Sequence, residues 1–467
     1  MNTRSLFAPG PGRLLLIAAS TAMFALGAAS ALYGPFFPYF AETLDLSPSK
    51  LGLLPGLHFA GATVGVLFGG MVARRVGYRR VLMVGGVVLT AGYGAVAVAW
   101  TWLLLQMGAA LLGLGFGLLV NVNILVDEAF GKMGAAALQL VNALFSVGAI
   151  VAPLLAIFSL QFGGQAVAFG VGAVLAVVLI GLLIKSGTSA DDLRAHQHEP
   201  TYDVAAPGQA SGDGAAADHA AGEGTSGTAE DPAASAVAAS TADLAATAAS
   251  AASASAASTG DPDTAASDTS ASGAKAHHRR ALILPTALFL PLYLLFPGTE
   301  ASFANWMPTH LFSLLPAAVA SAVVSGYWIT FTVGRLVAVP ISMRIRPGTL
   351  VGGAILLALL ATIAATVGPL APTAYLVAGL AMGPVFPGGL SWLRRRYPER
   401  AGEVASIIIA AGGIGGMIIP PVIGYIVEAR GIPAIAVTLA VLLSVAVLLA
   451  AVIGISGRTQ GPAVTTG

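Results

Sequence analysis

The acidic side chains are the first candidates for chemistry in this sequence. Of the 21 acidic residues, thirteen fall in one polar stretch, residues 186–280. The other eight are Glu42, Asp45, Asp127, Glu128, Glu300, Glu399, Glu403 and Glu428. Only Glu300 lies well inside a long apolar run, where a carboxylate is costly and usually faces a cavity or a partner. We therefore predict that Glu300 exchanges protons or contacts a substrate; the alternative is a structural hydrogen bond or an ion pair, for instance with His58.

The surroundings of Glu300 add to this prediction. Pro297 and Gly298 can break the helix just before it and free backbone carbonyl groups. Because a helix rises ~1.5 Å per residue, Glu300 falls in the outer part of its apolar run, so a gating role is also open. His58 could relay a proton, although a single histidine is more often a packing residue.

Other polar and aromatic residues in the apolar runs could line a substrate cavity. These candidates are Tyr33, Asn121, Asn123, Gln139, Asn142, Asn305, Trp306 and Tyr327. Asn121 and Asn123 point about 200° apart on a helix, so at least one of them bonds a neighbouring helix instead. Gln139, Asn142 and Ser146 share one helix face, which could line a cavity or contact another helix. Aromatic rings stack equally well on sugars and on flat drugs, so they do not identify the substrate.

Several kinds of chemistry are excluded. The chain has no cysteine, which rules out disulfides, thiolate metal sites and cysteine nucleophiles. The sequence GLGFG at 113–117 lacks the preceding strand and the following Lys-Ser/Thr of a phosphate-binding loop, and is better explained as close helix packing. A formal net charge of +1 gives no sign of nucleic-acid binding. We expect no metal, no cofactor and no enzymatic activity, since clustered acids and histidines are lacking inside the apolar runs.

The apolar runs themselves predict an all-α integral membrane protein. Hydrophobic residues make up 56% of the chain and charged residues 9%. Twelve runs are long enough to cross a ~30 Å hydrocarbon layer, and in lipid each must be a helix. They cover roughly 14–40, 51–73, 81–100, 103–126, 135–159, 165–185, 281–312, 318–343, 349–371, 373–393, 402–427 and 431–455.

The runs form two sets of six. We expect an N-terminal six-helix bundle at 1–185, a linker at 186–280 and a C-terminal bundle at 281–467. The linker is rich in Ala, Ser, Thr, Gly and Asp, and it cannot bury enough apolar surface to offset its chain entropy. We predict that it is disordered and cytoplasmic; a small docked helix is the alternative.

Basic residues predict the orientation. With both termini in the cytoplasm, all arginines and lysines except Lys50 and Arg430 fall in cytoplasmic loops or helix ends. This count places Arg335 at the cytoplasmic end of its helix. We expect a multi-pass protein of the inner, cytoplasmic membrane that contacts the lipid bilayer as a monomer.

The two sets of helices also repeat each other. GLGFG at 113–117 matches GLAMG at 379–383, an offset of 266 residues. The segments around Pro153 and Pro421 match at an offset of 268, and those around Pro38 and Pro308 at 270. Three similar offsets in chain order predict a duplicated unit with a binding site between the copies, which suits alternating access.

An arginine-rich loop joins the second and third runs, with the sequence GGMVARRVGYRR at 69–80. It resembles the signature of the major facilitator superfamily at that place, Gly-x-x-x-Asp-Arg-x-Gly-Arg-Arg. Gly70, Arg75, Gly77 and Arg79 match, whereas Arg74 stands at the aspartate. The resemblance implies a conformational-switch loop, in which the family's aspartate would cap a neighbouring helix and help to hold the outward-facing state. Without that acid, we expect Arg75 or Arg79 to meet a helix C-terminus, Glu399 or Glu403.

Within the superfamily, the chain is most similar to the fucose-permease-like branch of sugar/proton symporters. The similarity rests on NALFSVGAIVAPLL, GTEASFANWMPTHL, TVGRL, GPVFPGGLSW and GGIGGMIIPPVIG. It implies the major facilitator fold, with two six-helix pseudo-repeats and a central cavity lined by the first, fourth, seventh and tenth helices, which favours Tyr33 and Trp306. The branch's two cavity carboxylates have no counterpart, since the aligned positions are Gly34 and the apolar stretch near Leu118.

These observations predict a secondary active transporter. By resemblance, its small-molecule substrate is a sugar or a similar polar metabolite, moved by alternating access and coupled to a proton gradient at Glu300. The alternative is a proton-driven multidrug or metabolite efflux antiporter.

Overall fold

The computed structural model describes residues 11–186 and 268–456, and all regular structure there is helical. Twelve segments of this part of the chain are long and apolar enough to cross a membrane, which confirms the predicted spans. The first half contains α1 (Pro11–Leu44), α2 (Pro48–Val76), α3 (Tyr78–Ala97), α4 (Trp102–Leu119), α5 (Val122–Phe130), α6 (Gly134–Phe162) and α7 (Gln165–Ser186). The second half contains α10 (Asp268–Leu314), α11 (Ala317–Ser342), α12 (Pro347–Ala365), α13 (Ala371–Met382), α14 (Val385–Arg396), α15 (Ala401–Arg430) and α16 (Ala434–Ser456).

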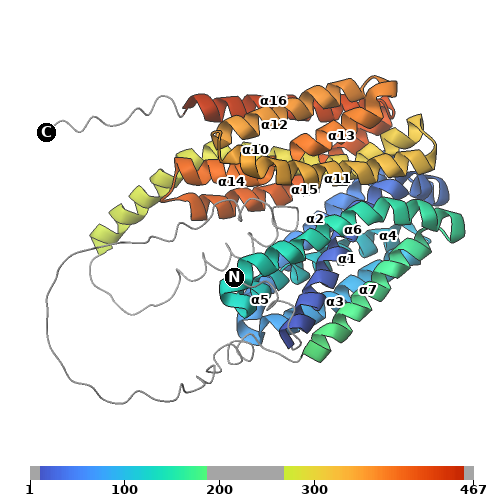
Figure 1. Ribbon diagram of the computed structural model, residues 1–467, viewed down its shortest axis with the longest axis horizontal. Helices are drawn as coiled ribbons and strands as arrows, with labels where there is room; N and C mark the ends of the chain where they lie inside the picture. Colours follow the sequence, from blue (N-terminus) through green and yellow to red (C-terminus); the bar gives the residue numbers. More distant parts are fainter. Residues whose placement is uncertain (1–10, 187–267, 457–467) are drawn as a thin grey trace, which may run out of the picture.

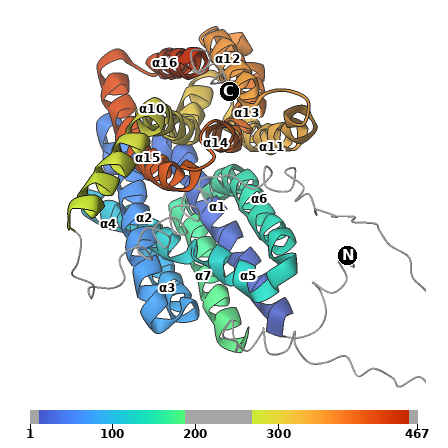
Figure 2. The ribbon, with the colours of Figure 1, turned by 90° about the vertical axis from the view of Figure 1, so that its left-hand side faces the viewer.

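The helices form two bundles that repeat one another (Figures 1 and 2). In the first, α1 packs on α6 and α7, and α4 packs on α2 and α3; in the second, α10 packs on α15 and α16, and α13 on α11 and α12. We call the end at which α1 begins and α7 and α16 end the terminal side, which lies at the left of Figure 1. The opposite end is the far side. The matching helix pairs confirm the predicted two six-helix repeats.

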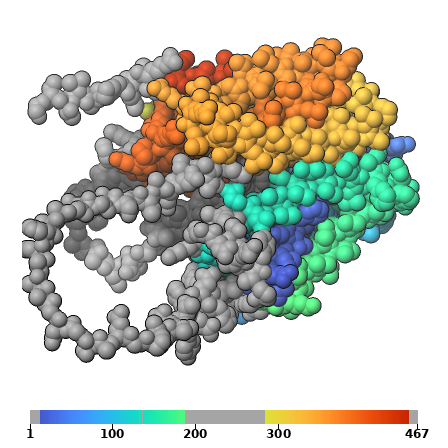
Figure 3. Space-filling model, in the orientation of Figure 1, coloured from blue at the N-terminus to red at the C-terminus, as the bar shows by residue number. Residues whose placement is uncertain are grey.

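The two bundles are in close contact at the far side. There α2 meets α15, α1 meets α10, and α6 meets α11 along the seam visible in Figure 3. Glycines let the backbones approach: a Cβ on Gly52 would lie 2.8 Å from the carbonyl oxygen of Pro420, and one on Gly424 would lie 2.5 Å from that of Pro48. Such contacts between small residues are a common way of packing helices in membranes. The two bundles are therefore closed against each other at the far side.

Two of the predicted spans are each broken into two helices. The span at 103–126 is interrupted at Val120–Asn121, where the Asn121 amide donates to the carbonyl of Leu118 (3.0 Å) and competes with the backbone donors. The span at 373–393 is interrupted at Gly383–Pro384, where Pro384 lacks the N–H group that would continue the helix. Both interruptions fall at equivalent places in the two halves, in keeping with the repeat.

The expected linker overlaps one helix. α10 begins at Asp268, so residues 268–280 of the expected linker are helical and continue directly into the next span. Extending an existing helix needs no new nucleation, and alanines favour it. The rest of the predicted linker, residues 187–267, lies outside the described residues, as do residues 1–10 and 457–467.

The arginine-rich loop is a tight turn between α2 and α3. Gly77 ends α2 with a φ of 89°, a conformation that strains other residues. Gly70 is buried, and the close approach to α4–α5 is made by its neighbour Gly69, where a Cβ would lie 2.8 Å from the Asn121 Nδ2 atom.

Arg79 meets a helix C-terminus, one of the partners expected for the loop arginines. Its Nε and Nη2 atoms donate to the carbonyls of Leu183 and Ile184, both at 3.1 Å. A cation at this place satisfies the unpaired carbonyls at the end of α7 and opposes the helix dipole. Among the described residues neither Arg75 nor Arg79 forms an ion pair with Glu399 or Glu403, because the bundles are in contact at the other end.

The second half has a similar clamp. Arg396, at the end of α14, donates to the carbonyl of Ile453 and to the Ser456 hydroxyl (3.2 Å). The last helix of each half is therefore held at its C-terminal end by an arginine from another helix.

The clamp on α7 predicts a difference between two neighbouring arginines. Arg79→Gln should lower the free energy of unfolding by about 1 kcal/mol, since it removes a cation that satisfies a helix end. Arg80→Gln is the matched control, because Arg80 is exposed and makes no recorded contact in the described chain. Thermal unfolding of both variants in detergent checks this, and equal loss in both would contradict the clamp.

Candidate functional site

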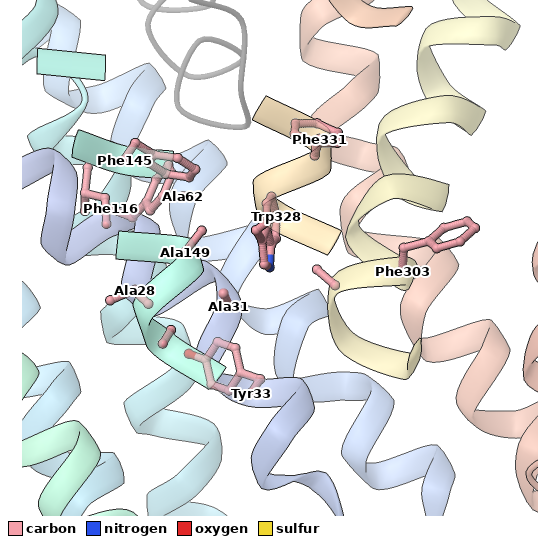
Figure 4. Close-up of a cluster of buried hydrophobic side chains, with 14 of the residues drawn as sticks. Ala28, Ala31, Tyr33, Ala62, Phe116, Phe145, Ala149, Phe303, Trp328 and Phe331 are labelled. Atoms are coloured by element: carbon pink, nitrogen blue, oxygen red, sulfur yellow. The ribbon is translucent and has the colours of Figure 1, made fainter. Parts of the chain in front are cut away.

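A cavity between the two bundles brings several predicted residues together. It receives side chains from α1, α2 and α4 on one side and from α10 and α11 on the other, and its empty space together with the open solvent at its mouth is about 500 Å³. Its lining consists of Ser30, Tyr33, Pro55, His58, Phe59, Ala62, Phe116, Glu300, Ala301, Ala304, Asn305 and Trp328. Figure 4 shows Trp328 between the ribbons of the two halves, with Tyr33 and Phe116 on the helices of the N-terminal half.

Glu300 contributes the only carboxylate of the lining. It is 5% exposed, and no hydrogen bond or ion pair is recorded for it among the described residues. Thr299 and Ser302 beside it donate to the carbonyls of their own helix instead, to Leu295 and Gly298. Neither of these two neighbours on α10 uses its hydroxyl hydrogen to bond the Glu300 carboxylate.

Tyr33 and His58 form a pair on the opposite wall. The Tyr33 hydroxyl lies 3.4 Å from His58 Nδ1, and the two rings pack edge to face with centroids 5.7 Å apart. Tyr33 comes from α1 and His58 from α2, and both side chains are buried. The backbone of His58 is held against α4, because Gly113 leaves room for the His58 carbonyl oxygen. Two titratable groups of the first half therefore face the same cavity as Glu300 of the second half.

Two polar groups of the lining have no hydrogen-bond partner in the described chain. One is the indole N–H of Trp328 and the other is the Oδ1 atom of Asn305, whose amide group donates to the Ala301 carbonyl at 2.7 Å. Both side chains are at least 95% buried. A buried donor or acceptor without a partner costs roughly 1–3 kcal/mol. A solute in the cavity that accepts from Trp328 and donates to Asn305 would recover that cost.

The remaining predicted cavity residues lie elsewhere in this conformation. The Trp306 indole donates to the Pro420 carbonyl at 2.9 Å and its ring packs on Phe37, so that it joins α10 to α15 and α1 near the far side. The Tyr327 ring stacks on Phe303 and its hydroxyl points to the Met382 sulfur at 3.8 Å. Neither is among the residues that line the cavity.

The predicted amides of the first half are also outside the cavity. Asn121 and Asn123 flank the start of α5 and are buried, and the two side-chain amide atoms of Asn123 have no partner in the described chain. Asn142 is buried on α6, whereas Gln139 is half-buried one turn earlier. The conformational-switch loop, with Arg75 exposed, lies at the terminal end of α2.

Arg335 is a residue that sequence reasoning misplaced. It was expected at a helix end, yet it is 5% exposed inside α11, seven residues before the helix ends at Ser342. Its Nε atom donates to the Gly383 carbonyl at the break between α13 and α14 (3.2 Å), and its guanidinium lies 4.6 Å from the Phe331 ring centre. It also acts electrostatically on Glu300 and Tyr327. An arginine between apolar residues on both sides was the signal that could have revealed it.

Trp328 lines the cavity in place of the aromatic residue that was predicted on α11. It is adjacent to the predicted Tyr327, and neighbouring residues point about 100° apart on a helix. The cavity therefore receives Trp328, while Tyr327 faces α10 and α13. No group of three or more metal-binding side chains is found among the described residues.

Comparisons with known proteins agree with this architecture. The family model of the Major Facilitator Superfamily matches residues 19–314 and 288–464. The chain is 31% identical over 148 residues to the 3-(3-hydroxy-phenyl)propionate transporter of Escherichia coli (strain K12), covering 31% of this chain and 36% of that protein. It is 29% identical over 136 residues to sodium-dependent glucose transporter 1A of Mus musculus, a match that covers 29% of this chain and 32% of that protein. A probable nitrate/nitrite transporter, NarK2 of Mycobacterium tuberculosis (strain CDC 1551 / Oshkosh), is 29% identical over 140 residues, covering 28% and 35%. The matches span about a third of the length of these relatives.

Solved structures share the fold at low sequence identity. The nucleoside transporter NupG superposes with a TM-score of 0.66 at 13% identity, covering 94% of this chain and 99% of that one. The xylose transporter XylE from E. coli, in a partially occluded inward open conformation, gives 0.62 at 12% identity, covering 93% and 97%. FucP in the outward conformation gives 0.52 at 15%, covering 94% and 98%. The family and these relatives are transporters, not enzymes. The chain belongs to the major facilitator superfamily and is a multi-pass membrane protein, as its sequence predicted.

Proposed function

We propose that this protein moves a small, neutral, polar ring compound such as a sugar across the cytoplasmic membrane, with proton coupling at Glu300. The observation that carries the proposal is the cavity between the bundles. It combines aromatic rings, two unpartnered hydrogen-bonding groups and one carboxylate, without an arginine or lysine in its lining. Sites of this kind, mostly apolar with a few polar groups that converge, are typical of small-molecule binding.

The charge of the lining separates the substrates named for similar proteins. Nitrate and a phenylpropionate are anions, and a buried anion needs a cationic partner. In this cavity an anion would instead meet Glu300, and His58 is the only basic side chain of the lining. Glucose, xylose and nucleosides are neutral and carry hydroxyl groups that can both donate and accept. The lining therefore favours the neutral class.

Aromatic and polar groups are arranged for such a solute on opposite walls. Tyr33, His58, Phe59 and Phe116 give the first half a largely aromatic wall, whereas Glu300, Asn305 and Trp328 offer hydrogen bonds from the second half. A sugar ring has apolar C–H faces and a polar edge, so it can use both walls at once. Binding a solute between the halves also brings them together, as alternating access requires.

Glu300 suits proton coupling because its charge is hard to keep inside the membrane. A carboxylate buried in a span is stabilised either by a proton or by a nearby cation. Arg335 in the same half supplies the cation that acts on it electrostatically. Protonation of Glu300 would change both the charge balance with Arg335 and the hydrogen bonds offered to the solute, which links proton binding to substrate binding.

The orientation follows from the terminal side. Exposed arginines of both halves surround it, namely Arg74, Arg75, Arg80, Arg344, Arg346, Arg394 and Arg395. Such positive charge is retained on the cytoplasmic side of membranes. We therefore assign the termini to the cytoplasm, and the present conformation, closed at the far side, faces inward.

Uptake into proteoliposomes tests the substrate class and the direction. With a proton gradient directed inward, at least one of glucose, fucose, xylose and uridine should accumulate, whereas nitrate should not. Collapse of the gradient with a protonophore should reduce accumulation to equilibration. Transport of nitrate in place of the neutral compounds would refute the proposed class, and gradient-driven export of hydrophobic cations would favour the antiporter alternative.

Substitution of Glu300 tests the coupling. Glu300→Gln keeps the shape and the hydrogen bonds of a protonated carboxyl group but cannot release the proton. We expect accumulation to fall at least about tenfold while solute exchange across the membrane continues, because exchange needs no net proton movement. Glu42→Gln is the control, since Glu42 is exposed near the far end of α1. Accumulation at the wild-type level in Glu300→Gln would end the coupling proposal.

Two tryptophans predict opposite results. Trp306→Phe removes a satisfied hydrogen bond to Pro420 and should lower the free energy of unfolding by about 1 kcal/mol. Trp328→Phe removes an unpartnered donor, so stability should be unchanged or slightly higher, but the KM for the transported solute should rise about tenfold. Thermal unfolding and initial uptake rates of both variants check this. A stability loss in Trp328→Phe without a change in KM would contradict a contact with the solute.

A further inference from the structure

A carboxylate of the second half caps a helix of the first half at the far side. The Glu428 Oε2 atom accepts a hydrogen bond from the backbone N–H of Ser49 at 3.0 Å. Glu428 lies near the end of α15, and Ser49 lies in the first turn of α2. The bond therefore joins the two bundles directly, and it must break when they separate at the far side.

The start of α2 lacks a capping hydrogen bond from its own N-cap residue. Ser47 is the N-cap residue, yet its side chain makes no capping bond to the helix and pairs with the Ser49 hydroxyl at 2.9 Å. Pro48 has no N–H group, so Ser49 carries the first backbone donor of the helix. The first N–H groups of a helix lack partners and favour a negative charge. Glu428 supplies that charge. Ser47, Ser49 and Lys50 all favour the ionised form of its carboxylate.

Close packing next to the cap depends on the same helix pair. A Cβ atom on Gly56 of α2 would lie 2.8 Å from the Met417 carbonyl oxygen of α15. Gly424 of α15 likewise allows the backbone of Pro48 to approach. The capping distance can form only while these backbones are in contact. The cap is thus a property of the far-closed conformation.

The other end of this helix pair has the opposite chemistry. α2 and α15 run antiparallel, so at the terminal side the start of α15 lies toward the end of α2. A matching cap there would need an acid at the end of α2 or in the turn to α3. Residues 74–80 contain four arginines and no acid, and Arg74 and Arg75 form the last turn of α2. At this end α2 therefore supplies cations, and the acid is Glu403 in the first turn of α15 itself.

We infer that Glu428 is a positioning residue for transport, which sets the balance between the two access states by holding the far side closed. The carboxylate stabilises the conformation open toward the terminal side, because its hydrogen bond to Ser49 exists only while the far side is closed. Loss of this bond shifts the balance toward the reverse conformation. The inference requires only alternating access, not the proposed substrate or the proton coupling.

The absence of cysteine in the chain makes a direct measurement practical. Spin labels on Thr43→Cys and Thr366→Cys report the far side, since both residues are exposed at that end, in α1 and at the end of α12. Labels on Val76→Cys and Gly402→Cys report the terminal side, at the end of α2 and the start of α15, where both positions are exposed. Distances from double electron–electron resonance in nanodiscs, without added substrate, give the populations of the two states.

Removing the cap should shift both distance distributions in a reciprocal way. In Glu428→Ala, the far-side-open population should rise about threefold to tenfold relative to the closed one, the range expected for loss of an N-cap acceptor. The terminal-side distance should shorten in the same fraction of molecules. Glu428→Gln, which keeps an acceptor but not the charge, should give a smaller shift. Glu42→Ala is the matched control and should change neither distribution.

A second variant tests the inference from the other end. Arg74→Glu places an acid at the end of α2 and should shift the populations in the same direction as Glu428→Ala. It also keeps the inference testable if Glu428→Ala fails to give a monodisperse protein. Unchanged distributions in Glu428→Ala would overturn the inference, as would far-side opening without terminal-side closing, which would indicate local fraying of α2. Loss of transport in Glu428→Ala with both distances at their wild-type values would also overturn the inference, because Glu428 would then act by another route than the balance of the two states.

Discussion

The cost of placing charge in hydrocarbon is the constraint on which the rest of this structure depends. Well inside the spans of the described chain there is one carboxylate, Glu300, and one guanidinium, Arg335, and both belong to the second bundle. Charged side chains buried in a membrane usually pair with another charge or with backbone carbonyl groups. Arg335 acts electrostatically on Glu300 and also donates a hydrogen bond to the Gly383 carbonyl at the break between α13 and α14. The first bundle contributes neutral, mostly aromatic side chains to the same cavity. The two halves share a fold, but the charge chemistry lies in only one of them.

The number of helices could be read from the sequence because hydropathy and length decide what crosses a membrane. Their division into two repeats could be read from the matching segments of the two halves. The interior of the helices was harder to predict. Tyr33, His58, Glu300 and Asn305 line the cavity, whereas Trp306 and Tyr327 are next to lining residues and face other helices. A shift of one residue turns a side chain by about 100°, and only the packing of neighbouring helices determines that rotation. Sequence patterns alone do not contain it.

The errors have similar physical causes. Arg335 was grouped with basic residues that mark helix ends, because a count of charges does not distinguish a charge at the surface from one bonded within the bundle. The break in the first half depends on a side-chain hydrogen bond from Asn121 to its own helix, and in the second half on Pro384. The loop signature identified the superfamily, yet the missing acid at Arg74 became informative only when Glu428 was seen on the other side.

The arginine clamps have a consequence for how the two bundles can be handled as separate parts. Arg79 fixes the end of α7 and Arg396 fixes the end of α16, each within its own half. A helix end that is held in this way does not rely on the chain beyond it for its position. Whatever follows Ser186 therefore starts from a fixed anchor, so the protein should accept insertions there, or assembly from two separately expressed fragments, without a change in helix register.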